Sequence, residues 1–300
     1  MSVATDAGQT QGWQSRTEAQ TQERTEDIAM GLRINTNIAA LNAGRVLARS
    51  TNSLNRSLER LSSGLRINRA RDDAAGLAIA DNFQSIVRGV QVSQRNAQDG
   101  VSLVQTAEGA LSETANILQR IRELAVQSAN GTQTSANRAS IDVEVQQLLQ
   151  QIDNIATNTE FNGTRVLSAS QTITLQAGAQ MGQTLLVNVA GAGTTDLGIT
   201  ALTVSSMANA VSAIGLADSA LASVSTLRSR LGAIQNRLEF TINTLAIQEE
   251  NSSAAESAIR DADIARETID FTRNQILVSA GTTVLAQANV VPQTALQLLG

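Results

Sequence analysis

Residues 79–125, IADNFQSIVRGVQVSQRNAQDGVSLVQTAEGALSETANILQRIRELA, decide the fold of this chain. Within this stretch, apolar or small residues recur at alternating steps of four and three positions. The positions are Ile79, Phe83, Ile86, Val90, Ser93, Ala97, Gly100, Val104, Ala107, Leu111, Thr114, Leu118, Ile121 and Ala125. A heptad pattern of this length keeps one face against a partner helix, so the stretch predicts one long helix of a coiled coil.

A second heptad pattern covers residues 217–259. Both patterns are longer than a typical globular helix. We therefore predict a mainly α protein: a long antiparallel coiled-coil or helical-bundle rod with a small β-hairpin region in the middle, and with its termini paired as a helical coiled coil. The predicted seam of the rod consists of Phe83, Val90, Val104, Leu111, Leu118, Val224, Leu231, Leu238 and Leu245.

Changes in pattern along the chain predict six segments. They are a polar, disordered extension (1–29), an N-terminal helix with a connector (30–73), the first half of the rod (74–166), a short β and loop region (167–208), the second half of the rod (209–260) and a C-terminal helix (261–300). Within them we expect a third amphipathic helix near 139–155 and strands at 172–175 and 185–189. Gly64 is expected to be a left-handed helix cap, and Pro292 is expected to end or bend the last helix.

The two terminal helices are expected to drive assembly. Their apolar positions are Ile34, Leu41, Leu54, Leu61, Leu277, Val284, Val291 and Leu298. These segments have no third partner within the chain, and an isolated helix pair is marginal in water. We therefore expect the ends to fold fully only when copies assemble.

The composition argues against an enzyme. The chain has no His and no Cys, and all 22 basic residues are Arg, which removes the commonest general base, the thiol nucleophile and the nitrogen and sulfur metal ligands. No cofactor and no metal are predicted, because the acidic pairs such as Asp72-Asp73 fit solvated faces or helix starts better than a site. The net charge of −5 argues against nucleic acid as a partner, and no apolar run is long enough for membrane insertion.

Several motifs resemble those of bacterial flagellins. They include GLRINTN at 31–37, LSSGLRIN at 61–68, DDAAG at 72–76, QRNAQDG at 94–100, LQRIRELAVQSAN at 118–130, FNG at 161–163, LGAIQNRL at 231–238, DAD at 261–263 and VLAQAN at 284–289. The likeness covers about residues 30–300, with the motifs in the family's order. It implies a structural subunit that polymerises into the extracellular flagellar filament used for motility.

The resemblance also implies partners. The subunit would be exported unfolded by the flagellar type III pathway, without a cleaved secretory signal, and would bind further copies of itself, an export chaperone, the filament cap and hook-junction proteins. Its paired termini would form the inner tube, and residues 167–208 stand where other members carry large outer domains. Two other functions stay open: a hook–filament junction protein, and an adhesin or innate-immune receptor ligand as the main role.

Four positions match the family's recognition site for the vertebrate Toll-like receptor that senses flagellin. They are Arg120, Leu124, Gln127 and Glu144, which the resemblance assigns to an outward face. The same surface makes axial contacts between subunits in the family, so polymerisation alone also accounts for these residues. The main departure from the family is the extension 1–29. We expect Met30 to be the true start and the extension to be a gene-model artefact; the rival interpretation is a genuine leader.

Overall fold

The computed structural model describes residues 36–297; the predicted extension 1–29 and the positions Ile34 and Leu298 lie outside this range. The described chain is mainly α-helical with two small antiparallel sheets, which confirms the predicted fold class. It divides into two compact units. Unit 1 contains the described residues up to Ala74 and from Arg260 onward, and unit 2 runs from Ala75 to Ile259.

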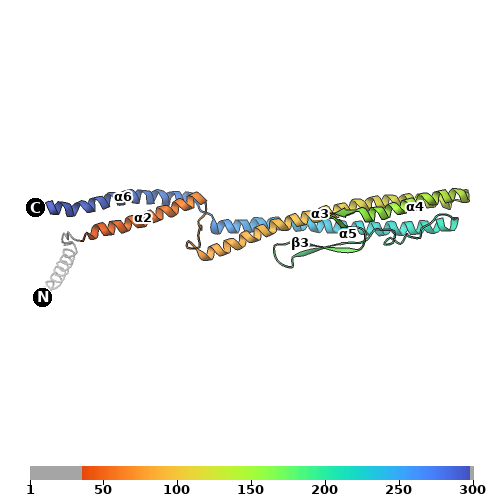
Figure 1. Ribbon diagram of the computed structural model, residues 1–300, viewed down its shortest axis with the longest axis horizontal. Coiled ribbons are helices and arrows are strands. Elements are labelled where there is room, and N and C mark those ends of the chain that lie inside the picture. The colour runs from red at the N-terminus through yellow and green to blue at the C-terminus, as the bar shows by residue number, and fades with distance from the viewer. Residues whose placement is uncertain (1–35, 298–300) are drawn as a thin grey trace, which may run out of the picture. The chain divides into compact units, whose positions relative to one another are not determined.

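Unit 1 is a pair of antiparallel helices, α2 (Ile38–Ser63) and α6 (Ile264–Gln297), which run side by side in Figure 1. Asn37 starts α2, because its side-chain oxygen accepts a hydrogen bond from the Ala40 amide at 3.0 Å. Gly64 ends α2 at φ 73°, where its N–H donates to the Arg60 carbonyl, as the sequence predicted. The Ala262 amide then donates to the Gly64 carbonyl at 2.9 Å and joins the end of α2 to the start of α6.

The contact between α2 and α6 mixes small and polar residues with larger apolar ones. The buried and half-buried positions follow heptad spacing on both helices: Ala40, Ala43, Leu47, Ser50, Leu54, Ser57 and Leu61 on α2, and Glu267, Phe271, Asn274, Val278, Gly281, Leu285 and Ala288 on α6. A Cβ at Gly281 would lie 3.1 Å from Leu47 Cδ1, so the helices approach closely there. Such a seam buries little apolar area, because Ser and Gly stand where a coiled coil usually carries Leu or Ile.

The sequence predicted that Pro292 ends or bends the last helix. It does not end it, since α6 continues to Gln297. A proline in a helix leaves the carbonyl four residues earlier without its N–H donor. That carbonyl belongs to Ala288, and the Asn37 side-chain amide donates to it at 2.7 Å. The helix therefore tolerates Pro292, because a residue from the other helix satisfies the freed oxygen.

Unit 2 contains three helices, α3 (Ala74–Ala129), α4 (Ser135–Asn158) and α5 (Met207–Arg260). The helices α3 and α5 are antiparallel, since Arg122 Nε lies 2.6 Å from Asp218 Oδ1 while Gln91 donates to Glu249 at 2.7 Å. Eight of the nine predicted seam residues are buried between the helices; the ninth, Phe83, is half-buried. By length and composition α5 would pass as a membrane span, but in the structure it packs in unit 2.

The heptad pattern fails at the start of α3. Ile79 is 50% exposed, whereas the adjacent Ala80 is fully buried. The buried positions Gly76 and Ala80 lead into half-buried Phe83 at heptad spacing, one residue out of register with Ile79. The small residues thus hold the seam at this end, and Ile79 faces outward.

Two β-hairpins follow α4. In the first, β1 (Glu160–Phe161) pairs with β2 (Thr164–Arg165) through Asn162 and Gly163, both at positive φ, the conformation that tight two-residue hairpins require. In the second, β3 (Gln171–Gln176) pairs with β4 (Thr184–Val189) from Gln171↔Val189 to Gln176↔Thr184. The second hairpin confirms the predicted β region. The first adds a pair of two-residue strands at the FNG motif, before the predicted β region.

The second hairpin packs closely on α3. A Cβ at Gly100 would lie 2.3 Å from Leu175 Cδ1, and one at Gly89 would lie 2.9 Å from Ala179 Cβ. Asn96 also donates to the Gln176 carbonyl at 3.1 Å. Glycine at these two helix positions therefore provides the space that the hairpin occupies.

Two aspartate side chains of α4 hold the segment after β4, residues 190–206. Asp153 accepts from the Thr194 amide at 2.8 Å and from its hydroxyl at 2.9 Å. Further along, Asp142 accepts from the Val204 amide at 2.7 Å. Ile199, Leu202 and Val204 are buried, so this irregular segment completes the core that the three helices leave open.

Candidate assembly surfaces

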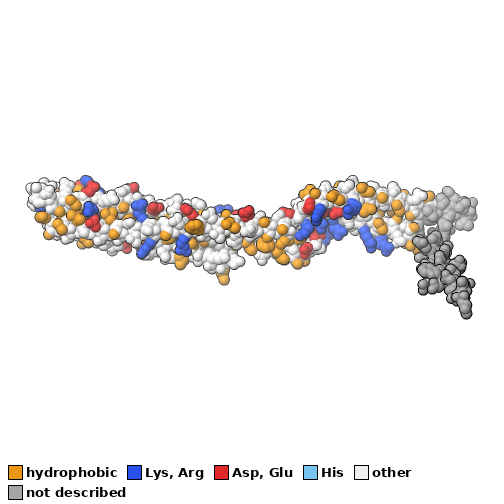
Figure 2. Space-filling view, turned by 180° about the vertical axis from the view of Figure 1, so that it is seen from behind, with side chains coloured by type: hydrophobic (Ala, Val, Ile, Leu, Met, Phe, Trp, Pro, Cys, Tyr) orange, Lys and Arg blue, Asp and Glu red, His pale blue; other side chains and the backbone are white. Residues whose placement is uncertain are grey.

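The most conspicuous surface of unit 1 is apolar and exposed. We use the name outer apolar face for this set of exposed side chains, which are spread around the two helices: Ile38, Leu41, Val46 and Leu58 on α2, and Ile264, Ile269, Ile276, Leu277, Val284 and Val290 on α6. Figure 2 shows hydrophobic side chains along both helices of this unit. A shallow groove of about 470 Å³ on α6 lies between Ile269, Ile276, Leu277 and their polar neighbours. Large apolar side chains thus point to solvent, while the large apolar residues of the seam are only half-buried and Ser50 and Ser57 are buried.

The predicted terminal assembly residues fall on both faces. Leu54 and Leu61 lie half-buried on the seam. Leu41, Leu277 and Val284 lie on the outer apolar face. Val291 lies within α6, and its side chain is outside the described part of the structure. Leu277 and Val284 of the predicted pattern therefore lie on the outward side of α6, one residue away from the seam positions Val278 and Leu285.

Sequence reasoning missed Ile269 and Ile276 on the same face. Their spacing of seven residues was a usable signal, because it marks a second apolar row on α6 beside the row at 277 and 284.

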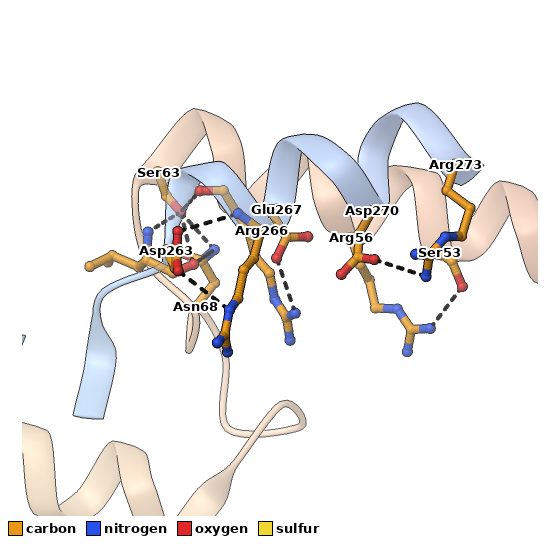
Figure 3. Close-up of polar contacts among 11 residues, drawn as sticks. Ser53, Arg56, Ser63, Asn68, Asp263, Arg266, Glu267, Asp270 and Arg273 are labelled. Atoms are coloured by element: carbon orange, nitrogen blue, oxygen red, sulfur yellow. Dashed lines mark hydrogen bonds and ion pairs between the residues drawn. The ribbon is translucent and has the colours of Figure 1, made fainter. Parts of the chain in front are cut away.

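Polar contacts fix the end at which α2 and α6 meet (Figure 3). Asp263 caps α6 by accepting from the amides of Ala265 at 3.0 Å and Arg266 at 3.3 Å. Ser63 Oγ accepts from the Leu65 amide at 3.1 Å and from the Asn68 side chain at 2.8 Å. At this end Arg60 Nη1 on α2 also lies 3.6 Å from Glu267 Oε2 on α6. These contacts order the end of α2 and the start of α6, and Asn37 joins the two helices near the other end of the pair.

The four predicted receptor positions divide into an exposed group and one buried residue. Arg120 Nη2 lies 2.9 Å from Glu144 Oε1 on α4, and its Nη1 lies 3.3 Å from Glu123 Oε2. Hydrogen bonds to Glu144 and then to Glu123 raise the pKa of Arg120 above its ordinary value. Gln127 is exposed on the same helix. The cluster presents a fixed guanidinium beside two carboxylates.

Leu124 does not share the outward placement expected for it. Its side chain is only 2% exposed and belongs to the core of unit 2. A single seam would leave Leu124 outside, but α4 and residues 190–206 cover a second side of α3 and bury it. The candidate receptor surface therefore consists of Arg120, Gln127 and Glu144.

The part of the chain that the structure describes contains no group of three or more acidic, His or Cys side chains placed to hold a metal ion.

Comparison with known proteins agrees with this architecture. The profile of the bacterial flagellin N-terminal helical region matches residues 34–172, and that of the bacterial flagellin C-terminal helical region matches residues 214–299. The chain belongs to the bacterial flagellin family. The two profiles cover α2, α3, α4 and α6 in full and α5 from residue 214 onward, so the family assignment covers each candidate assembly surface.

Similar proteins align with this chain over nearly their whole length. The flagellin of Halalkalibacterium halodurans is 47% identical over 269 residues, which cover 89% of this chain and 99% of that protein. The flagellin of Bacillus subtilis is 44% identical, over 89% of this chain and 100% of that protein. A flagellar filament 33 kDa core protein of Treponema phagedenis is 44% identical, over 89% of this chain and 99% of that protein.

Proposed function

We propose that this chain is the structural subunit of a bacterial flagellar filament and that it polymerises with copies of itself. The observation that carries the proposal is the outer apolar face of unit 1. Burying one exposed Leu or Ile is worth about 1.5–3 kcal/mol, and this face contains ten large apolar side chains. Neighbouring copies that cover these side chains supply the stability that the half-buried seam lacks.

Family membership supports the finer parts of the proposal. The subunit is exported unfolded by the flagellar type III pathway, works outside the cell in motility, and meets an export chaperone, the filament cap and hook-junction proteins on the way. A unit 1 held by a weak seam suits this route, because it unfolds at low cost and gains its stability on assembly. The names of the relatives described above favour the filament subunit over the hook–filament junction protein.

Seeded growth tests the filament proposal. Purified full-length protein is dissociated by heat, added to sheared filament seeds, and followed by electron microscopy and by sedimentation. We expect long filaments made only of this chain. Short caps that stop growing on the seeds would favour the junction protein, and absence of any growth with intact protein would refute polymerisation.

We also propose that the monomer is a ligand of the vertebrate Toll-like receptor that senses flagellin, through Arg120, Gln127 and Glu144. The exposed ion pairs of Arg120 support it, because they hold a guanidinium in a defined position on the surface. A reporter-cell assay with monomer checks this. Arg120→Ala should weaken the response, and Glu113→Ala, an exposed change on the same helix, should not. Equal responses to wild type and Arg120→Ala would remove the proposal.

A further inference from the structure

Unit 2 exposes an aromatic ring that its own fold does not use. Phe240 on α5 is 72% exposed, although the chain has only four Phe and one Trp. The three other Phe residues are all half-buried. The preceding residue, Glu239, is also exposed, and its side chain accepts a hydrogen bond from Gln235 at 3.2 Å. Exposed aromatic side chains are enriched in protein–protein interfaces, where aromatic residues and Arg often serve as anchors.

A receptive groove lies on another part of the same unit. It has a volume of about 280 Å³ and is lined by the ends of β3 and β4, by Leu227 and by Arg230. Cavities of about 150 Å³ hold a benzene ring, so a phenyl side chain fits. Among residues 36–297, no carboxylate forms an ion pair with Arg230, whereas the nearby Arg228 lies 3.6 Å from Glu108.

Glu239 and Arg230 of one copy cannot meet. They lie nine residues apart on one straight helix, which places them about 180° apart around its axis and about 13.5 Å apart along it. The ring-bearing face and the groove therefore point in different directions. Two different patches that fit each other make a heterologous contact, which generates open filaments or rings rather than closed pairs.

We propose that Glu239 and Phe240 of one copy dock into the Arg230 groove of the next copy. The Arg230 guanidinium pairs with the Glu239 carboxylate and stacks on the Phe240 ring, an arrangement that Arg favours over Lys. This contact rests on the proposed polymerisation and adds to it one specific interface in unit 2.

Charge reversal tests the contact in the full-length protein. Arg230→Glu and Phe240→Ala should each raise the critical concentration for seeded growth by roughly tenfold or more. The matched control is Arg88→Glu, which makes the same charge change at an exposed position of α3 outside the groove. It should leave the critical concentration within about twofold. The double variant Arg230→Glu/Glu239→Arg restores an opposite pair between copies and should recover most of the growth.

The outcomes separate this contact from the proposed function. Wild type that fails to grow on seeds refutes polymerisation itself. Wild type that grows while Arg230→Glu grows equally well refutes only the contact. An Arg88→Glu variant as defective as Arg230→Glu does the same. Circular dichroism of the monomers must be unchanged by the substitutions. A double variant that folds as the wild type does but remains as defective as Arg230→Glu also overturns the pairing.

Discussion

The Asn37 side-chain amide lies 2.7 Å from the carbonyl oxygen of Ala288, so one side chain from the start of α2 completes the hydrogen bonding of α6. The same side chain caps α2 through its oxygen, which accepts from the Ala40 amide. Because Pro292 removes the normal donor to Ala288, Asn37 and Pro292 form a matched pair across the two helices. Their pairing also fixes the register of α2 against α6 at the end of the pair that lies far from Ser63 and Asp263.

Asn37→Ala should destabilise the assembled state by about 1–2 kcal/mol per subunit, since it removes both the cap and the donor to Ala288. The measurement is the dissociation temperature of filaments. In a Pro292→Ala background the new amide at 292 can donate to Ala288, so Asn37→Ala should cost less there. Asn42→Ala, an exposed change on the same helix, is the control. An equal cost of Asn37→Ala in both backgrounds would contradict the pairing.

The sequence predicted unit 2 better than unit 1 for a physical reason. In unit 2 both long helices carry large apolar residues in one register, so the heptad pattern and the buried face coincide. In α6 two apolar rows lie side by side, one through Leu277 and one through Val278, and periodicity alone does not choose between them. In the structure the row through Val278 packs against α2, where Ser50 and Ser57 are buried, and the row through Leu277 is exposed.

The candidate receptor surface had a similar limit. Its three residues, Arg120, Gln127 and Glu144, could be identified by their match to the family's motifs. Leu124 was misplaced because a single heptad cannot reveal that α4 covers a second side of α3. That covering depends on contacts between distant segments, such as Asp142 with the Val204 amide.

Two helix glycines should respond in opposite ways to alanine. Gly100→Ala brings a Cβ to 2.3 Å from Leu175 Cδ1, so we expect it to destabilise unit 2 by about 1–3 kcal/mol. Gly109→Ala meets nothing within 4 Å and should stabilise α3 by about 0.5–1 kcal/mol. Urea unfolding of the full-length monomer measures both. Adding Leu175→Ala to Gly100→Ala should remove part of the overpacking strain, and the same cost with and without it would argue against the close hairpin contact.

Asp153 is expected to hold the segment 190–206 on α4. Asp153→Ala removes two hydrogen bonds to a carboxylate, each worth about 1.5–3 kcal/mol, and leaves the Thr194 amide without its acceptor. Hydrogen exchange of the full-length monomer should show faster exchange at Thr194 and in the residues around it. The exposed change Asp99→Ala should leave this exchange unaltered. Unchanged protection in Asp153→Ala would mean that the buried Ile199 and Leu202 hold the segment alone.

A substitution on the outer apolar face should affect filament assembly but not the folding of the monomer. Ile276 is 63% exposed, so Ile276→Ser removes almost no contact within the monomer and should change its unfolding free energy by less than about 0.5 kcal/mol. In the filament the same change replaces a buried isoleucine with a hydroxyl, at a cost of about 2–4 kcal/mol per subunit. Seeded growth should then require at least tenfold more protein, because 1.4 kcal/mol already corresponds to tenfold. The control is Thr282→Ser, an exposed and polar change on α6. An Ile276→Ser protein that grows at the wild-type critical concentration would show that this face stays in solvent, and would place the assembly contacts of unit 1 elsewhere.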